Sequence, residues 1–183
     1  MEHLQYPIGR FQPKPDYTPE ENAALLQYLE KAPALYEELM ANTSEADLTK
    51  TYRPGAWSVQ QLVHHVADIH LLNFLRLKKA ITEENYEITL IRMDNWAALP
   101  DSTQLPINSS LLIFKGVNQR YIHLLKTLDE QTLSKTYYHA ARKLDLSLKQ
   151  LLHMATWHVG HHLGHIELAL GKQPQELKVG AEL

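Results

Sequence analysis

The chain lacks cysteine altogether, so it can form no disulfide and offers no thiolate metal ligand and no thiol nucleophile. Any bound metal ion must therefore be held by nitrogen and oxygen donors. The sequence also lacks an apolar run of the roughly 18 residues that a membrane-spanning helix needs. Residues 1–10 do not have the basic and then apolar layout of a secretion signal. These absences predict a cytoplasmic protein without membrane contact.

An excess of positive charge is missing as well. The chain has 18 basic and 21 acidic residues and a formal net charge of -3, so we expect neither nucleic acid nor anionic lipid as a partner. What it does contain is 44% apolar residues and 11 histidines. At 183 residues it is long enough to bury a core, and we expect one domain over residues 1–183.

Three N-terminal capping signals mark the starts of long helices. Each pairs a hydroxyl residue with a Glu or Gln three positions later: Thr18 with Glu21, Ser58 with Gln61, and Ser147 with Gln150. The last of these helices should run to about Leu170 and stop at Gly171. Pro33 is expected to kink or split the first.

Apolar residues at helical intervals predict a further long helix over residues 109–128. Residues 82–108 lack this periodicity and read as a long connection, with a short helix near residues 94–99. Residues 136–146 should form a turn or short hairpin, and the Pro-rich residues 6–15 an extended arm. The pattern predicts an all-α four-helix bundle with an extended N-terminal arm and a long loop between helices two and three.

The densest group of histidines lies in residues 157–165. In a helix, His161 and His165 are one turn apart on the same face, and two imidazoles at this spacing can chelate one ion. His158 and His162 are expected toward the edge of that face. The pair predicts a metal site on the core-facing side of the last helix.

A third ligand is needed, and residues 64–70 are the other histidine-rich window. His65 shares a helix face with neighbouring leucine and isoleucine residues, whereas His64 projects toward Asp68, so we predict His65 as the ligand. Asp68 could then orient an imidazole. A lone histidine on an apolar face is usually a hydrogen-bonded core residue, but 7 of the 11 lie in these two windows, which favours metal binding.

The chain resembles the DinB/YfiT-like family of metal-binding four-helix bundles, and within it the YfiT branch, described as bacillithiol S-transferases or metal-dependent hydrolases. The motifs that carry the resemblance are Tyr6–Gly9, Tyr52–Arg53 with Gly55, Trp57–Val59, Val63–Asp68 with His70, Ile91–Arg92 with Asp94 and Trp96, and the last helix through Glu167. The resemblance implies that His65, His161 and His165 bind one zinc or nickel ion, and that the protein is a homodimer.

On this resemblance we expect a metal-dependent enzyme that acts on a small molecule, most simply a thiol S-transferase with bacillithiol or a similar thiol as co-substrate. Tyr52, Arg53 and Arg92 are candidates to hold carboxylate groups of such a thiol, because guanidinium makes bidentate contacts with carboxylate. Trp96 is a candidate cavity wall. The alternatives are ordinary surface ion pairs for the arginines and a core position for Trp96.

Asp68, His158 and Glu167 are the candidate proton acceptors, and no spacing decides between them. A metal-dependent hydrolase that activates water against an amide or ester remains an alternative, as does a non-catalytic binding protein whose metal only joins the helices. A haem bundle is disfavoured, because three clustered histidines exceed the usual axial ligands. Imidazole suits zinc, nickel, copper and iron alike, so the sequence leaves the metal open.

Overall fold

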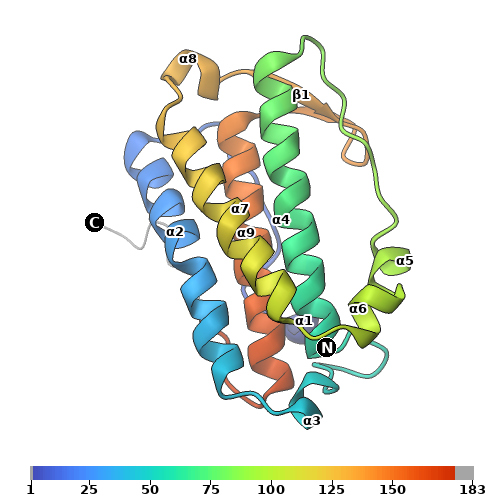
Figure 1. The fold of residues 1–183 in the computed structure, drawn as a ribbon. Helices are drawn as coiled ribbons and strands as arrows, with labels where there is room; N and C mark the ends of the chain where they lie inside the picture. Colours follow the sequence, from blue (N-terminus) through green and yellow to red (C-terminus); the bar gives the residue numbers. More distant parts are fainter. Residues whose placement is uncertain (1, 176–183) are drawn as a thin grey trace.

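The computed structural model describes residues 2–175, and four long helices dominate this part of the chain (Figure 1). They are α2 (Pro19–Ala41), α4 (Val59–Thr82), α7 (Asn108–Lys126) and α9 (Leu148–Ala169). Helices α2 and α4 each pack against both α7 and α9. Figure 1 shows α4 and α7 running in one direction and α2 and α9 in the other. Because the neighbours α4 and α7 are parallel, the chain between them must travel back along the bundle, which explains the long connection.

The predicted helix starts are confirmed. Helices α2, α4 and α9 each begin with a capping box, formed by Thr18, Ser58 and Ser147. The hydroxyl of this first residue accepts a hydrogen bond from the backbone N–H three residues later, and the side chain of that later residue accepts one from the backbone N–H of the first. Helix α9 ends just before Gly171, which has a φ of 72°. The all-α four-helix bundle predicted from the sequence is therefore the observed fold.

Pro33 lies inside α2, and the helix continues through it. Proline cannot donate to the carbonyl of Leu29, one turn earlier. The side-chain amide of Asn118 on α7 donates to that carbonyl instead, at 2.9 Å, and both residues are buried. Of the expected kink or split, the split does not occur, and a neighbouring helix supplies the donor that proline lacks.

The connections carry short elements. They are α1 (Glu2–Gln5), α3 (Glu45–Leu48), α5 (Met93–Ala97), α6 (Pro100–Gln104), α8 (Glu130–Leu133), and the antiparallel pair of β1 (Thr136–His139) and β2 (Leu144–Ser147). The hairpin and a short helix in the long connection were predicted, whereas α1, α3, α6 and α8 were not. The hairpin places Thr136 opposite Ser147, directly before α9.

The N-terminal segment after α1 is irregular, as predicted, and lies along α9. The indole N–H of Trp157 donates to the Gly9 carbonyl at 3.1 Å. Pro7 approaches Gly164 so closely that a Cβ on this glycine would lie 3.0 Å from the proline Cγ. Residues 2–15, which comprise α1 and the irregular segment after it, are called the N-terminal arm below.

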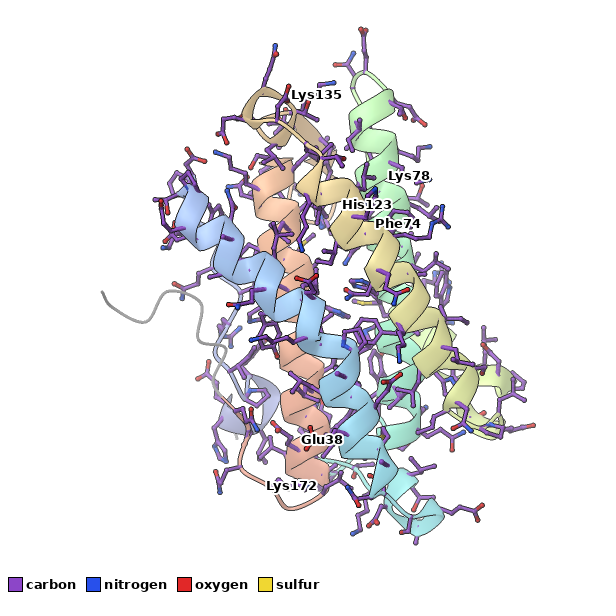
Figure 2. The ribbon with its side chains drawn as sticks, turned by 60° about the vertical axis from the view of Figure 1, so that its left-hand side comes forward. Glu38, Phe74, Lys78, His123, Lys135 and Lys172 are labelled. Atoms are coloured by element: carbon purple, nitrogen blue, oxygen red, sulfur yellow. The ribbon has the colours of Figure 1, made fainter. Side chains whose placement is uncertain are left out.

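The core lies between the four long helices. Its fully buried members include Leu25, Leu29, Tyr36, Leu62, Leu77, Phe114, Tyr121, Leu151 and Leu152. In Figure 2, side chains fill the space between these helices, with Lys135 near one end and Glu38 and Lys172 near the other. Within residues 2–175 no helix combines the length and the hydropathy needed to cross a membrane.

Candidate metal centre

Histidine rings from two helices meet inside the bundle. Among the residues that the structure describes, the ring nitrogens form two overlapping groups whose ligand atoms lie within 4.8 Å of one another. One group is His65, His158 and His162, and the other is His161, His162 and His165. We call these five residues the histidine cluster. His65 comes from α4 and the other four from α9, so the antiparallel packing of these helices builds the cluster.

The predicted ligands all belong to the cluster, but they do not form one tight group. The rings of His161 and His165 lie 4.3 Å apart between centroids, as expected for residues one turn apart. His65 lies instead against His158, with 3.1 Å between their Nε2 atoms, and against His162, with 4.8 Å between ring centroids. His162 therefore stands between His65 and the pair. The assignment of His65, His161 and His165 as ligands stays a prediction.

Sequence reasoning placed His158 and His162 at the edge of the helix face and so undervalued them. Every residue from Val159 to Glu167 is buried, because the N-terminal arm covers a side of α9 that helical periodicity treats as exposed. A signal was available, since His158 and His162 have the same four-residue spacing as His161 and His165.

The cluster is electrically neutral near pH 7. Burial lowers the pKa of His65 to about 4. Burial, with the neighbouring His165 and His65, lowers the pKa of His161 to about 3. Burial, with the charge of Arg53, lowers the pKa of His165 to about 4. Neutral imidazoles keep a free lone pair, which is the form that binds a metal ion.

Hydrogen bonding leaves some of these lone pairs available. The Nδ1 atoms of His158 and His161 are buried and have no partner among residues 2–175. His165 Nε2 donates to the Gln5 carbonyl at 3.2 Å, so its Nδ1 carries the lone pair, and this atom lies 3.3 Å from Nδ1 of His162. A ring that donates one N–H to a backbone carbonyl and turns its other nitrogen inward is the usual arrangement of a metal-binding histidine. The cluster therefore fits a divalent metal ion with a preference for nitrogen ligands.

A cavity of about 390 Å³ opens beside the cluster, and we call it the arm cavity. Its lining includes Gln5, Tyr6, Tyr52, Arg53, Trp57, Asp94, His161, His162 and His165. The Tyr52 ring stacks on the His165 ring, with centroids 3.9 Å apart. The Arg53 guanidinium carbon lies 5.4 Å from the centre of the Tyr52 ring. An aromatic ring and a cation thus form one wall of a cavity whose floor carries imidazoles.

The other predicted substrate-binding residues lie elsewhere. Arg92 and Trp96 are both exposed, and neither lines the arm cavity. Asp94, which was noted only as part of a motif, is the one carboxylate among the described residues that line it. Tyr52 and Arg53 are therefore brought to the cluster, whereas Arg92 and Trp96 are not.

The candidate proton acceptors are separated from one another. Asp68 belongs to neither histidine group, and its pKa is raised by burial and then by Asp101. Glu167 is buried, but its carboxylate accepts the backbone N–H of Gln175 at 3.1 Å, outside the arm cavity. His158 alone of the three is a member of the cluster.

The two remaining histidines of α4, His64 and His70, lie outside the histidine cluster and contact other parts of the bundle. His64 has ring nitrogens 2.7 Å from the Ser110 hydroxyl and 3.1 Å from the Leu105 carbonyl. The His70 ring packs edge-on against Phe114 and Tyr121 of α7. The choice of His65 over His64 therefore agrees with where these rings lie.

Comparisons with known proteins also lead to a family of helical bundles with metal-dependent members. Residues 28–166 match the family model of the DinB superfamily. A relative from Bacillus pumilus, named "Putative metal-dependent hydrolase", is 39% identical over 166 residues, which cover 91% of this chain and 94% of the relative. The solved structure of YfiT from Bacillus subtilis, described as a probable metal-dependent hydrolase with an unusual four-helix bundle topology, superposes with a TM-score of 0.88 at 31% identity, over 93% of this chain and 99% of that one. A mutant of mycothiol-dependent maleylpyruvate isomerase is similar in fold alone, with a TM-score of 0.65 at 14% identity, over 79% of this chain and 60% of that one.

Proposed function

The chain belongs to the DinB superfamily, and on that premise we propose that it is a metal-dependent enzyme that transfers a small thiol, such as bacillithiol, to an organic electrophile. The observation that carries the proposal is the cluster of neutral imidazoles, three of which, those of His161, His162 and His165, are buried and line the arm cavity. The metal would be one divalent zinc or nickel ion, for which imidazole is a suitable ligand.

His65, His161 and His165 would hold this ion; the alternative set is His65, His158 and His162, whose ligand atoms lie within 4.8 Å of one another. His161 and His165 both line the arm cavity, and the bond from Nε2 of His165 to the Gln5 carbonyl leaves the lone pair of this ring on Nδ1. Three imidazole ligands leave further coordination positions open, as in catalytic rather than structural sites. A divalent ion held there would supply positive charge that favours the ionised form of a thiol or of water and polarises a carbonyl.

The residues around the arm cavity favour a thiol. Arg53 offers a guanidinium that can pair with a carboxylate of the thiol, and Tyr52 lies between it and His165. A free thiol has a pKa of about 8.5, far below that of water, so its ionisation needs no strong protein base. The chain has no cysteine, so the reacting sulfur would come from the diffusible thiol. The thiol would release its proton to solvent and the sulfur–carbon bond would form. Either a carbon–halogen bond would break and halide would leave, or an epoxide C–O bond would break and its oxygen would take up a proton from solvent.

Hydrolysis of an amide or ester is the second candidate. Asp94 lines the arm cavity and could accept a proton from water, and the relatives carry the hydrolase name. In this alternative the same histidines would bind the metal ion, while Arg53 would orient the amide or ester substrate rather than a thiol.

Metal analysis tests the ligand set. The purified protein, prepared without chelator, should contain about one divalent ion per chain, and His161→Ala should lose it. His123→Ala is the matched control, because His123 is exposed on α7 and outside the cluster. His162→Ala tests whether His162 is a ligand in place of one of the predicted three. We expect this variant to retain metal, and loss of metal would replace the predicted set by one that includes His162.

Activity measurements test the reaction class. The metal-loaded protein is incubated with bacillithiol and a chloro-aromatic compound or an epoxide, and in parallel with a panel of amides and esters. We expect conjugation above the rate of the metal-free protein and no hydrolysis. Hydrolysis without conjugation would support the second candidate. A stoichiometric metal without turnover of any compound would indicate a binding protein whose metal only joins the helices.

A further inference from the structure

A second cavity lies on the other side of the histidine cluster. It measures about 420 Å³, within the range of roughly 300 to 1,000 Å³ of small-molecule sites, and it is bounded by α4, α9, the β1–β2 hairpin and the chain before α5. We call it the hairpin cavity. Its walls are mainly apolar and include Ile69, Leu90, Ile91, Met93, Met154 and Trp157. His158 of the cluster lies at its wall, so the cluster separates the two cavities.

Arg76 is the charged group of this cavity that needs explaining. It lines the cavity with only 9% of its surface exposed. One terminal nitrogen donates to the Asn73 side chain at 3.1 Å and the other to the Thr89 carbonyl at 3.3 Å, while Nε has no partner. In the described part of the chain, no carboxylate lies within salt-bridge distance of the guanidinium. A buried charge without a counter-charge is costly unless something else pairs with it.

The surroundings of Arg76 add positive potential and unpaired polar atoms. Arg142 and His139 line the same cavity, and the pKa of His139 is lowered by burial first and then by the charges of Arg142 and Arg76. The Nδ1 of His139 is buried and has no partner within residues 2–175. The hydroxyl of Tyr137, a residue outside the cavity lining, also lacks one; burial raises its pKa and the charge of Arg76 lowers it. Cationic and donor groups therefore gather at one region of an otherwise apolar cavity.

We propose that the hairpin cavity binds a small organic carboxylate with an apolar body, whose carboxylate pairs with Arg76 and whose body packs on Met154 and Trp157. A planar guanidinium matches a carboxylate in shape and charge, and the apolar walls match a hydrocarbon or aromatic group. This binding requires no metal ion, so it stands or falls separately from the function proposed above. If that function also holds, the molecule bound here lies within reach of the cluster through His158.

The test compares 2-naphthoate with its neutral analogue 2-naphthamide, by isothermal titration of the metal-free and the metal-loaded protein. The wild type should bind naphthoate at least about tenfold more tightly than naphthamide, because a charge-assisted pair replaces a neutral hydrogen bond. Arg76→Gln should abolish this preference. Arg120→Gln is the matched control, since Arg120 is exposed on α7 and lies over Phe74, outside the cavity.

A second variant keeps the test decisive if Arg76→Gln does not fold. Ala141 is an exposed residue of the hairpin turn that lines the cavity, so Ala141→Phe should fill the cavity while the bundle stays folded. It should lose naphthoate binding. Equal affinity of the wild type for naphthoate and naphthamide, unchanged binding by Ala141→Phe, or a preference that survives Arg76→Gln would each overturn the proposal. Displacement of naphthoate by inorganic phosphate alone would do so too, because it would indicate a phosphate site.

Discussion

The phenol ring of Tyr52 lies flat on the imidazole of His165, with ring centroids 3.9 Å apart and planes inclined by 12°. Tyr52 belongs to the segment before α4, whereas the Gln5 carbonyl, which accepts from the same imidazole, belongs to α1. Two segments far apart in the sequence thus hold one ring of the cluster from outside α9. The orientation of His165 depends on them as much as on its own helix.

Tyr52→Ala should therefore weaken metal binding by about tenfold, the lower end of the effect of removing groups that orient a metal ligand. Tyr52→Phe keeps the ring and should leave the affinity unchanged. Competition with a chromophoric chelator measures both. An equal loss of metal affinity in the two variants would show that the phenol hydroxyl of Tyr52, and not its stacking on His165, supports metal binding.

The stability of the metal-free protein should fall as the pH is lowered from about 6.5 to about 4. Burial holds the pKa of His65 near 4, below the unfolded value of 6.5, so between these values the unfolded state binds more protons than the folded state. The contribution is fully present above pH 6.5 and lost as the pH falls through the folded pKa, on the order of 3 kcal/mol for this ring. Urea unfolding at several pH values measures it.

The comparison that isolates this effect uses His65→Gln, which should make the free energy of unfolding less dependent on pH over that range. His123→Gln, an exposed substitution on α7 (Figure 2), should leave the slope unchanged. A slope that is the same in wild type and His65→Gln would mean that His65 is protonated as readily in the folded protein as in the unfolded one.

Features determined within a few residues could be predicted from the sequence. The capping of α4 by Ser58 and the pairing of His161 with His165 depend only on helical geometry, and both are present. The four-residue spacing of His158 and His162 indicates a second pair, but the burial of His162 could not be predicted, because it depends on the N-terminal arm covering α9. In sequence Arg76 is one cation among 18, and its burial depends on other segments of the chain: its guanidinium donates to the Thr89 carbonyl and shares a cavity with residues of the hairpin.

The exposed positions of Arg92 and Trp96 have a related cause. The sequence points to both residues only through a motif in the long connection, and a motif does not determine the direction in which an irregular segment turns. In the structure their neighbour Asp94 lines the arm cavity. The direction of that segment is fixed by contacts of α5 and α6 with α4, which lie far away in sequence.

Asn118→Ala should destabilise the fold by about 1 to 3 kcal/mol, because it leaves the buried Leu29 carbonyl without a donor. Pro33→Ala restores a backbone N–H one turn along α2, so in that background the cost of Asn118→Ala should shrink. A double-mutant cycle measured by urea unfolding tests this coupling. Additive effects of the two substitutions would show that the Asn118 amide does not compensate for the proline.

Gly164→Ala should displace the N-terminal arm, because the new Cβ would lie 3.0 Å from Cγ of the rigid Pro7 ring. Overpacking of this kind costs about 1 to 3 kcal/mol, more than the gain of up to about 1 kcal/mol in helix propensity. Moving the arm also withdraws the Gln5 carbonyl from His165, so metal affinity should fall together with the melting temperature. Gly116→Ala is the matched control on α7, with nothing within 4 Å of the added Cβ, and it should be neutral or stabilising. If the clash is the cause, adding Pro7→Ala to Gly164→Ala should restore both the metal affinity and the melting temperature. A Gly164→Ala protein that behaves like Gly116→Ala would show that the arm does not hold the site in place.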